Sequence, residues 1–128
     1  MNTPFQNDYV TICLLQEILY IHYKQAQLIN FAAAKAIVRD RIRYQDQVSY
    51  PILCDISAIK YIDYSARNYL AQEGSVLTKA VALICRDAER QLMSDYYVTV
   101  CQPTVPTAIF SEEGSAVKYL ENYKKSLL

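Results

Sequence analysis

Residues 50–55 read Tyr-Pro-Ile-Leu-Cys-Asp, and residues 80–85 read Ala-Val-Ala-Leu-Ile-Cys. Both runs are short and almost wholly apolar, as is typical of parallel strands that are covered on both faces. Between them, Asp63 is a good N-cap for a helix over residues 64–72, which we expect Gly74 to end as a C-cap. This strand–helix–strand pattern predicts two parallel strands joined by a right-handed crossover.

The same alternation continues on both sides of this unit. Residues 9–15 and 18–24 are rich in β-forming residues, and the two-residue gap at Gln16-Glu17 favours a hairpin. Asn30 is placed to cap an alanine-rich helix over residues 31–45. The other expected elements are a loop over 56–62, a helix over 87–101 capped by Asp87, a short strand over 107–110 and a final helix capped by Ser111.

The predicted order of elements is β-β-α-β-α-β-α-β-α, in one domain spanning residues 1–128. It predicts an α/β fold, a single-layer and mostly parallel sheet of about five strands with an antiparallel N-terminal hairpin and four helices. The 128 residues, 52% of them hydrophobic, fit one domain with one core.

Charge and hydropathy exclude several classes of protein. The formal net charge is zero, whereas general nucleic-acid binders carry a clear basic excess. The N-terminus lacks the positive start and apolar stretch of a secretory signal. No apolar run approaches the roughly 20 residues that span a bilayer. We therefore expect a cytoplasmic protein that has no membrane span and does not bind nucleic acid.

The cysteines and the histidine give little sign of a metal site. Cys13, Cys54, Cys85 and Cys101 include no C-x-x-C pair, and His22 is the single histidine. We expect buried free thiols, no metal and no cofactor. Cys54 and Cys85 both end apolar strands, which would place them near the carboxyl edge of the sheet, where α/β folds bind ligands. A reactive site there and two inert thiols both remain open, the second being favoured.

One segment resembles a known family. Residues 53–70 read Leu-Cys-Asp-Ile-Ser-Ala-Ile-Lys-Tyr-Ile-Asp-Tyr-Ser-Ala-Arg-Asn-Tyr-Leu. They resemble the STAS-domain pattern apolar-x-Asp-apolar-Ser-x-apolar-x-x-apolar-Asp-Ser-Ser-Gly of anti-sigma-factor antagonists. Residues 79–123 are also similar to bacterial STAS/CRAL-TRIO-like proteins of unknown function. The resemblance implies a SpoIIAA-like fold.

The resemblance also implies a candidate site. In anti-sigma-factor antagonists a partner kinase phosphorylates the second serine of Asp-Ser-Ser-Gly and so switches binding off. By position, Asp55 matches the earlier acidic residue, Asp63 matches the Asp, and Ser65 matches the phosphoacceptor. Tyr64 replaces the first serine of that motif, and Ala66-Arg67 stands where the family has small residues. The alternative is that Ser65 is simply a good first-turn residue.

Three functions remain open. The resemblance implies a non-enzymatic regulatory module that binds a protein partner, such as a kinase-like regulator, through Asp55, Asp63, Tyr64 and Arg67. For such a module we expect no deep cavity. The second function is a carrier of a small apolar ligand, which expects an apolar pocket between the sheet and the helix over 31–45 or that over 87–101. The third is a homodimer with a structural role. The two aspartates lack a clustered His, Lys or metal, which argues against an enzyme.

Overall fold

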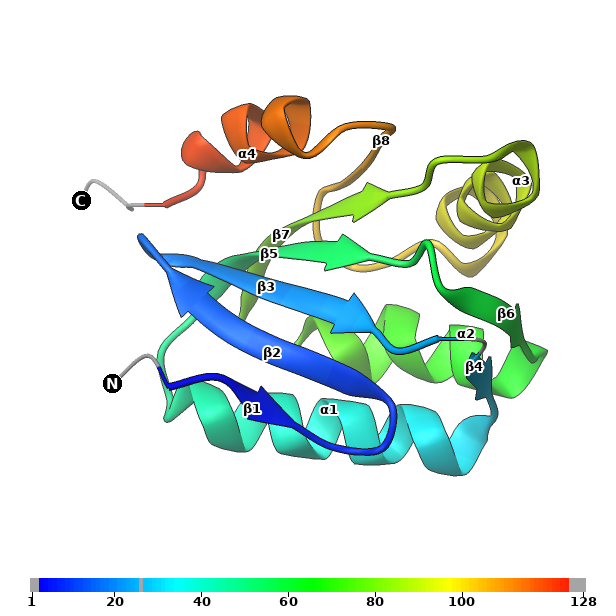
Figure 1. Cartoon of the computed structure of the whole chain (residues 1–128), viewed down its shortest axis with the longest axis horizontal. Helices are drawn as coiled ribbons and strands as arrows, with labels where there is room; N and C mark the ends of the chain where they lie inside the picture. Colours follow the sequence, from blue (N-terminus) through cyan, green and yellow to red (C-terminus); the bar gives the residue numbers. More distant parts are fainter. Residues whose placement is uncertain (1–2, 26, 125–128) are drawn as a thin grey trace.

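The computed structural model describes residues 3–25 and 27–124. Its main sheet has six strands in the order β1-β2-β3-β5-β7-β8 (Figure 1). The first three strands pair antiparallel, and β3, β5, β7 and β8 pair parallel. The bounds are β1 Phe5–Gln6, β2 Val10–Leu15, β3 Ile18–Tyr23, β5 Tyr50–Asp55, β7 Thr78–Ile84 and β8 Thr107–Phe110. The predicted α/β fold with an N-terminal hairpin is confirmed, with β1 as an added edge strand.

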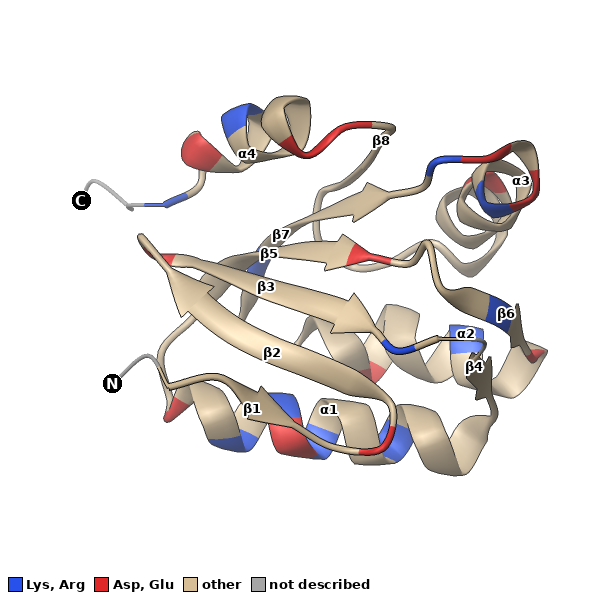
Figure 2. Ribbon diagram, in the orientation of Figure 1, with Lys and Arg blue, Asp and Glu red and all other residues tan. Residues whose placement is uncertain are grey.

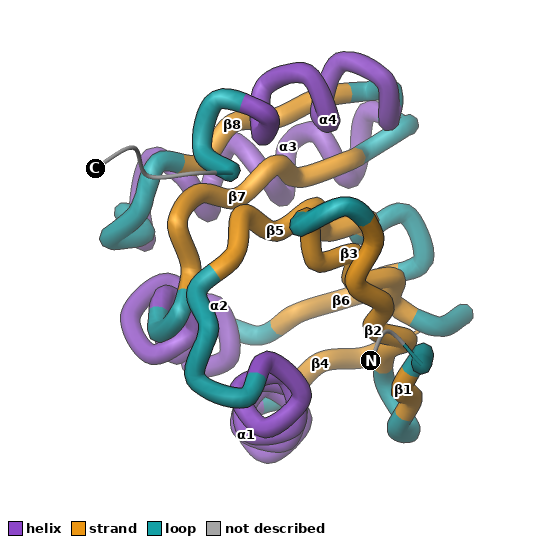
Figure 3. The backbone as a smooth tube through the Cα atoms, turned by 90° about the vertical axis from the view of Figure 1, so that its left-hand side faces the viewer, coloured by secondary structure: helices purple, strands orange, loops and turns teal. Residues whose placement is uncertain are grey.

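The helices lie on both faces of this sheet. Their bounds are α1 Phe31–Gln45, α2 Tyr64–Gln72, α3 Ala88–Tyr96 and α4 Glu113–Glu121; a 3-10 turn η1 (Glu73–Ser75) follows α2, and a π-helical turn η2 (Tyr97–Cys101) follows α3. Helices α1 and α2 cover one face and α4 covers the other (Figure 3). Helix α3 lies at the end of the sheet where β5 and β7 finish (Figure 1).

Three predicted N-caps are confirmed. The side chains of Asn30, Asp63 and Asp87 each accept a hydrogen bond from the backbone N–H three residues later, at 2.8, 2.9 and 2.8 Å. Each bond satisfies an N–H that the first helical turn would otherwise leave unpaired. The hairpin turn is confirmed too: Gln16 and Glu17 both have positive φ, which matches the twist of a two-residue β-turn.

Two predicted helix ends are wrong. Gly74 does not end α2 in a left-handed C-cap; it lies inside η1 with a negative φ, because the chain tightens into a 3-10 turn before leaving the helix. Ser111 does not cap α4. Glu112 has the extended backbone of the N-cap, and helix α4 starts one residue later than expected, without a side-chain cap bond.

Two predicted segments also differ. Residues 59–62, expected to be loop, form β6 (Ile59–Ile62), which pairs parallel with β4 (Gln27–Ile29) in a separate two-stranded sheet. The two ends of β6 are buried and its two central residues are exposed, so burial anchors it without an alternating pattern. The helix expected over 87–101 ends at Tyr96 and widens into the π-helical turn η2.

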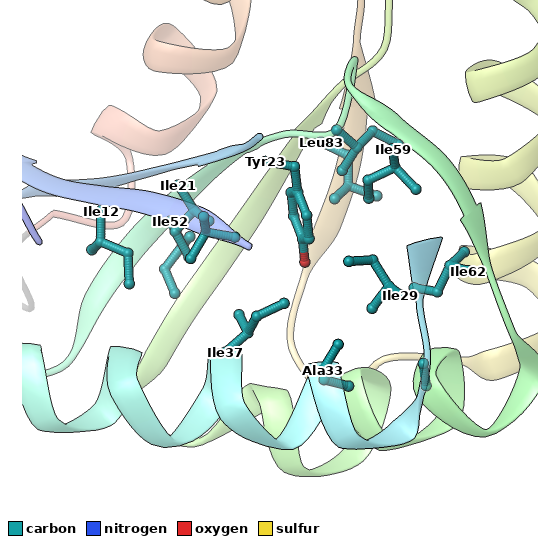
Figure 4. Close-up of a cluster of buried hydrophobic side chains, with 14 of the residues drawn as sticks. Ile12, Ile21, Tyr23, Ile29, Ala33, Ile37, Ile52, Ile59, Ile62 and Leu83 are labelled. Atoms are coloured by element: carbon teal, nitrogen blue, oxygen red, sulfur yellow. The ribbon is translucent and has the colours of Figure 1, made fainter. Parts of the chain in front are cut away.

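Alternate side chains of each central strand enter two different cores. Ile52 and Leu83 pack on the face covered by α1 and α2, together with Ile37. Leu53 and Ile84 pack on the opposite face against α4. This alternation follows from the two-residue side-chain period of a strand. Figure 4 shows the first core, between β2, β3, β5 and β7 and helix α1.

Candidate functional site

A cavity of about 110 Å³ lies within the first core, between the sheet and helices α1, α2 and α3. Most of its wall is apolar. The strands contribute branched side chains, and the helices contribute branched side chains and a methionine: Ile21, Ile52, Leu83, Ile59, Ile62, Ile37, Leu70 and Met93. Several of these side chains surround the ring of Tyr23 in Figure 4. A wall of this kind suits the hydrocarbon part of a small molecule.

A guanidinium group interrupts this apolar wall. Arg41 lies on the buried face of α1, lines the cavity and is only 3% exposed. Its Nη1 donates to the side chain of Gln45, and its Nη2 donates to the backbone carbonyl of Gly74 at 3.1 Å. Burial lowers the pKa of Arg41 to about 10, so the side chain stays cationic at neutral pH.

A second arginine and a serine of the lining hold buried polar atoms. Arg67 donates from Nη1 to the carbonyl of Ile62 at 2.8 Å, and its guanidinium lies 4.8 Å from the ring centre of Tyr96. Its Nε is buried and has no hydrogen-bond partner in the described part of the chain; the same holds for Oγ of Ser94, a residue that is 1% exposed on α3. Unpaired buried donors are rare in folded proteins.

The remaining polar groups of the wall are neutral. Burial raises the pKa of Tyr23 well above its usual value, and it also raises the pKa of Tyr97. Burial raises the pKa of the Cys54 thiol to about 12. In Figure 4 the hydroxyl of Tyr23 points from β3 into the space above α1. The cavity therefore combines an apolar wall with cationic and neutral hydrogen-bonding groups.

The sequence-predicted Asp55 belongs to a different network, at the carboxyl end of β5. Nη1 of Arg86 donates to Asp55 at 2.8 Å and to the hydroxyl of Ser57 at 2.9 Å. The Ser57 N–H also donates to Asp55, at 2.9 Å, while Nε2 of His22 lies 4.0 Å away. Burial acts to raise the pKa of Asp55, but the hydrogen bonds from Ser57 and Arg86 outweigh it and lower the pKa below its usual value.

The other predicted site residues lie in the first two turns of α2, where they face two different environments. Asp63 caps the helix, and the exposed Ser65 donates from its hydroxyl to Asp63 at 3.1 Å. Tyr64 is 56% exposed beside it. Arg67, one turn later, lines the cavity. The structure thus brings Asp63, Tyr64 and Ser65 together on the surface, with Asp55 in the Arg86 network and Arg67 in the cavity wall.

The sequence interpretation missed Arg41, Ser94 and Tyr23. One signal for Arg41 was present, because Ile37, Arg41 and Gln45 recur every four residues and therefore share one face of a helix. A charged residue on an otherwise buried helix face indicates either a binding site or a structural hydrogen bond or ion pair.

The predicted placement of two thiols is confirmed. Cys54 lies in β5 and Cys85 directly follows the neighbouring β7, and both are free. Within residues 3–25 and 27–124, no three His, Cys, Asp or Glu side chains are grouped to hold a metal ion. Among the same residues, no helix combines the length and hydropathy needed to cross a membrane.

Comparison with known proteins supports the fold. One similar solved structure is an uncharacterized protein of the DUF3478 family from Shewanella loihica PV-4, described as having a SpoIIAA-like fold. It superposes on this chain with a TM-score of 0.59 at 14% sequence identity, and the match covers 91% of this chain and 98% of that chain. At this identity the likeness shows a shared SpoIIAA-like fold. No curated protein matches the sequence significantly. Residues 12–124 match the family described as Domain of unknown function (DUF7793), and the chain therefore belongs to that family.

Proposed function

We propose that this protein is a non-enzymatic binding module, acting in the cytoplasm, that takes up a small and largely apolar ligand in the cavity beneath β3, β5 and β7. The observation that carries this proposal is the apolar cavity of about 110 Å³. Its size is similar to that of an engineered apolar cavity of about 150 Å³ that binds benzene. The cavity favours this function over the interaction module, which expected no deep cavity.

The energetics of burying a hydrocarbon support the same proposal, because each CH₂ group that moves from water into an apolar site contributes about 0.8 kcal/mol. Asp55 and Asp63 are both engaged in structural hydrogen bonds, which supports a non-enzymatic role.

The test combines native mass spectrometry with thermal denaturation. Protein purified from its own cells should carry a small adduct, and small apolar probes should raise its melting temperature. Val38→Met, which adds volume at the cavity wall, should abolish the probe effect, whereas Val117→Met, on α4 in the other core, should leave it intact. The absence of both an adduct and any probe effect on the native protein would refute the proposal.

A second function is favoured by the surface at the start of α2. Tyr64 and Ser65 are exposed there beside Asp63, as a regulatory contact with a protein partner requires. Phosphopeptide mass spectrometry of native protein should then find phosphate on Ser65, and Tyr64→Ala should lose a kinase-like partner in pull-downs. Tyr61→Ala, at an exposed tyrosine on β6, is the matched control. Unmodified Ser65 across growth conditions, with unchanged partners, would remove this function.

A further inference from the structure

The six arginines of the chain divide into two groups. Four form ion pairs with carboxylates: Arg39 and Arg43 with Asp40, Arg86 with Asp55, and Arg90 with Asp87 and Glu89. Figure 2 shows basic and acidic segments close together along α1 and α3. Arg41 and Arg67 make no such pair within 4.0 Å among the described residues, and both line the cavity. The two arginines without a carboxylate partner among the described residues are therefore the two that line the cavity.

Arg41 is a buried charge held by neutral acceptors. A guanidinium taken out of water needs a counter-charge or a full set of hydrogen bonds. The structure supplies the side-chain oxygen of Gln45 and the carbonyl of Gly74, whereas the group carries five N–H donors. The end of α2 and η1 adds a partial negative charge at Gly74. These contacts orient Arg41 but leave its positive charge without a carboxylate from residues 3–25 and 27–124.

Two further donors of the wall lack acceptors. Nε of Arg67 and Oγ of Ser94 are buried without a hydrogen-bond partner in the part of the chain that the structure describes. They belong to residues on different helices, α2 and α3, that both line the cavity, but the two atoms themselves are covered by protein. A carboxylate in the cavity supplies the counter-charge that Arg41 lacks among the described residues, together with two acceptor oxygens for its N–H donors.

We propose that the ligand of this cavity is a small apolar carboxylic acid, whose hydrocarbon part fills the apolar space and whose carboxylate pairs with Arg41. The inference rests on the proposed function and adds the chemical class of the ligand. A neutral hydrocarbon would leave the charge of Arg41 without a counter-charge, and a small inorganic anion would leave the apolar wall unfilled.

Matched probes separate charge from shape. 3-Methylbutanoate carries both features, 3-methylbutanamide has nearly the same shape without the charge, and acetate has the charge with little hydrocarbon. Titration of the full chain, followed by ¹⁵N–¹H spectra, should show 3-methylbutanoate binding at least tenfold more tightly than either control. Arg41→Met should reduce the preference for the acid over the amide to about onefold, while Arg41→Lys, which keeps the charge, should retain part of it.

The outcomes distinguish the two proposals. Equal or tighter binding of the amide to the unaltered protein would overturn the carboxylate inference and leave the apolar-ligand function standing. Binding of none of the three probes would overturn the carboxylate inference, while the apolar-ligand function would still depend on the native adduct and the apolar probes described above. Equal binding of acetate and 3-methylbutanoate would overturn both, because the hydrocarbon part would then contribute nothing. Because the comparison on the unaltered protein is decisive alone, failure of Arg41→Met to fold does not affect the test.

Discussion

Replacing Ser94 with alanine should stabilise the ligand-free protein, although most substitutions of buried residues destabilise a fold. Ser94 is 1% exposed, and its Oγ has no hydrogen-bond partner among residues 3–25 and 27–124. Leaving a buried polar group unpaired costs about 1–3 kcal/mol. Alanine removes that cost, and within a helix it adds at most about 0.7 kcal/mol of propensity. We therefore expect the free energy of unfolding to rise by about 1–3 kcal/mol.

The assay is urea denaturation followed by circular dichroism, in which the midpoint should rise while the slope stays constant. Ser115→Ala, at an exposed position of α4, is the control for helix propensity alone. A loss of stability, or a gain no larger than that of the control, would show that the hydroxyl is already satisfied.

Three further predictions concern the surface network, the thiol and the cap. Hydrogen bonds from Ser57 and Arg86 lower the pKa of Asp55 against the effect of burial, so its contribution to stability should be present above the unfolded pKa of about 3.9 and lost as pH falls through the folded pKa. In urea denaturation at a series of pH values, Asp55→Asn should reduce the fall in the free energy of unfolding below about pH 4, and an unchanged pH profile would contradict this. Burial raises the pKa of the Cys54 thiol to about 12, so Cys54 should react with iodoacetamide at pH 8 far more slowly in the folded protein than in the urea-unfolded protein. Peptide mass spectrometry measures the two rates, and equal rates would refute this prediction. Asp63→Ala should lower the free energy of unfolding by about 1 kcal/mol, measured by urea denaturation, whereas Asp63→Ser should retain most of the cap; equal losses would refute the capping role.

Local signals account for the part of the fold that sequence predicts well. Asn30, Asp63 and Asp87 cap their helices through bonds to a backbone N–H only three residues away, so the residue type and its position are sufficient. Strands β4 and β6 depend instead on pairing between segments about thirty residues apart, and each is only three or four residues long. Their hydrophobic pattern is too short to separate strand from loop.

In the candidate site, too, local contacts could be predicted from the sequence and long-range contacts could not. The N-cap at Asp63 located the first turn of α2 correctly, because the cap and the N–H that it binds lie in one continuous segment. The role of Arg41 depends on the carbonyl of Gly74, which is 33 residues away in sequence. No local pattern relates these two groups, so only the packing of α1 against α2 reveals where the guanidinium is held.

Helix α1 also shows why the carboxylate inference needs the structure. Arg39, Arg41 and Arg43 look alike in sequence, separated by single residues, but successive side chains along a helix are rotated by about 100°. Arg39 and Arg43 therefore reach solvent and pair with Asp40, while Arg41 turns inward to the cavity. Among the residues that the structure describes, the same chemical group is a paired surface charge at two positions and a buried charge without a carboxylate at the third. That contrast within one helix makes Arg41 the residue whose partner is to be sought among ligands.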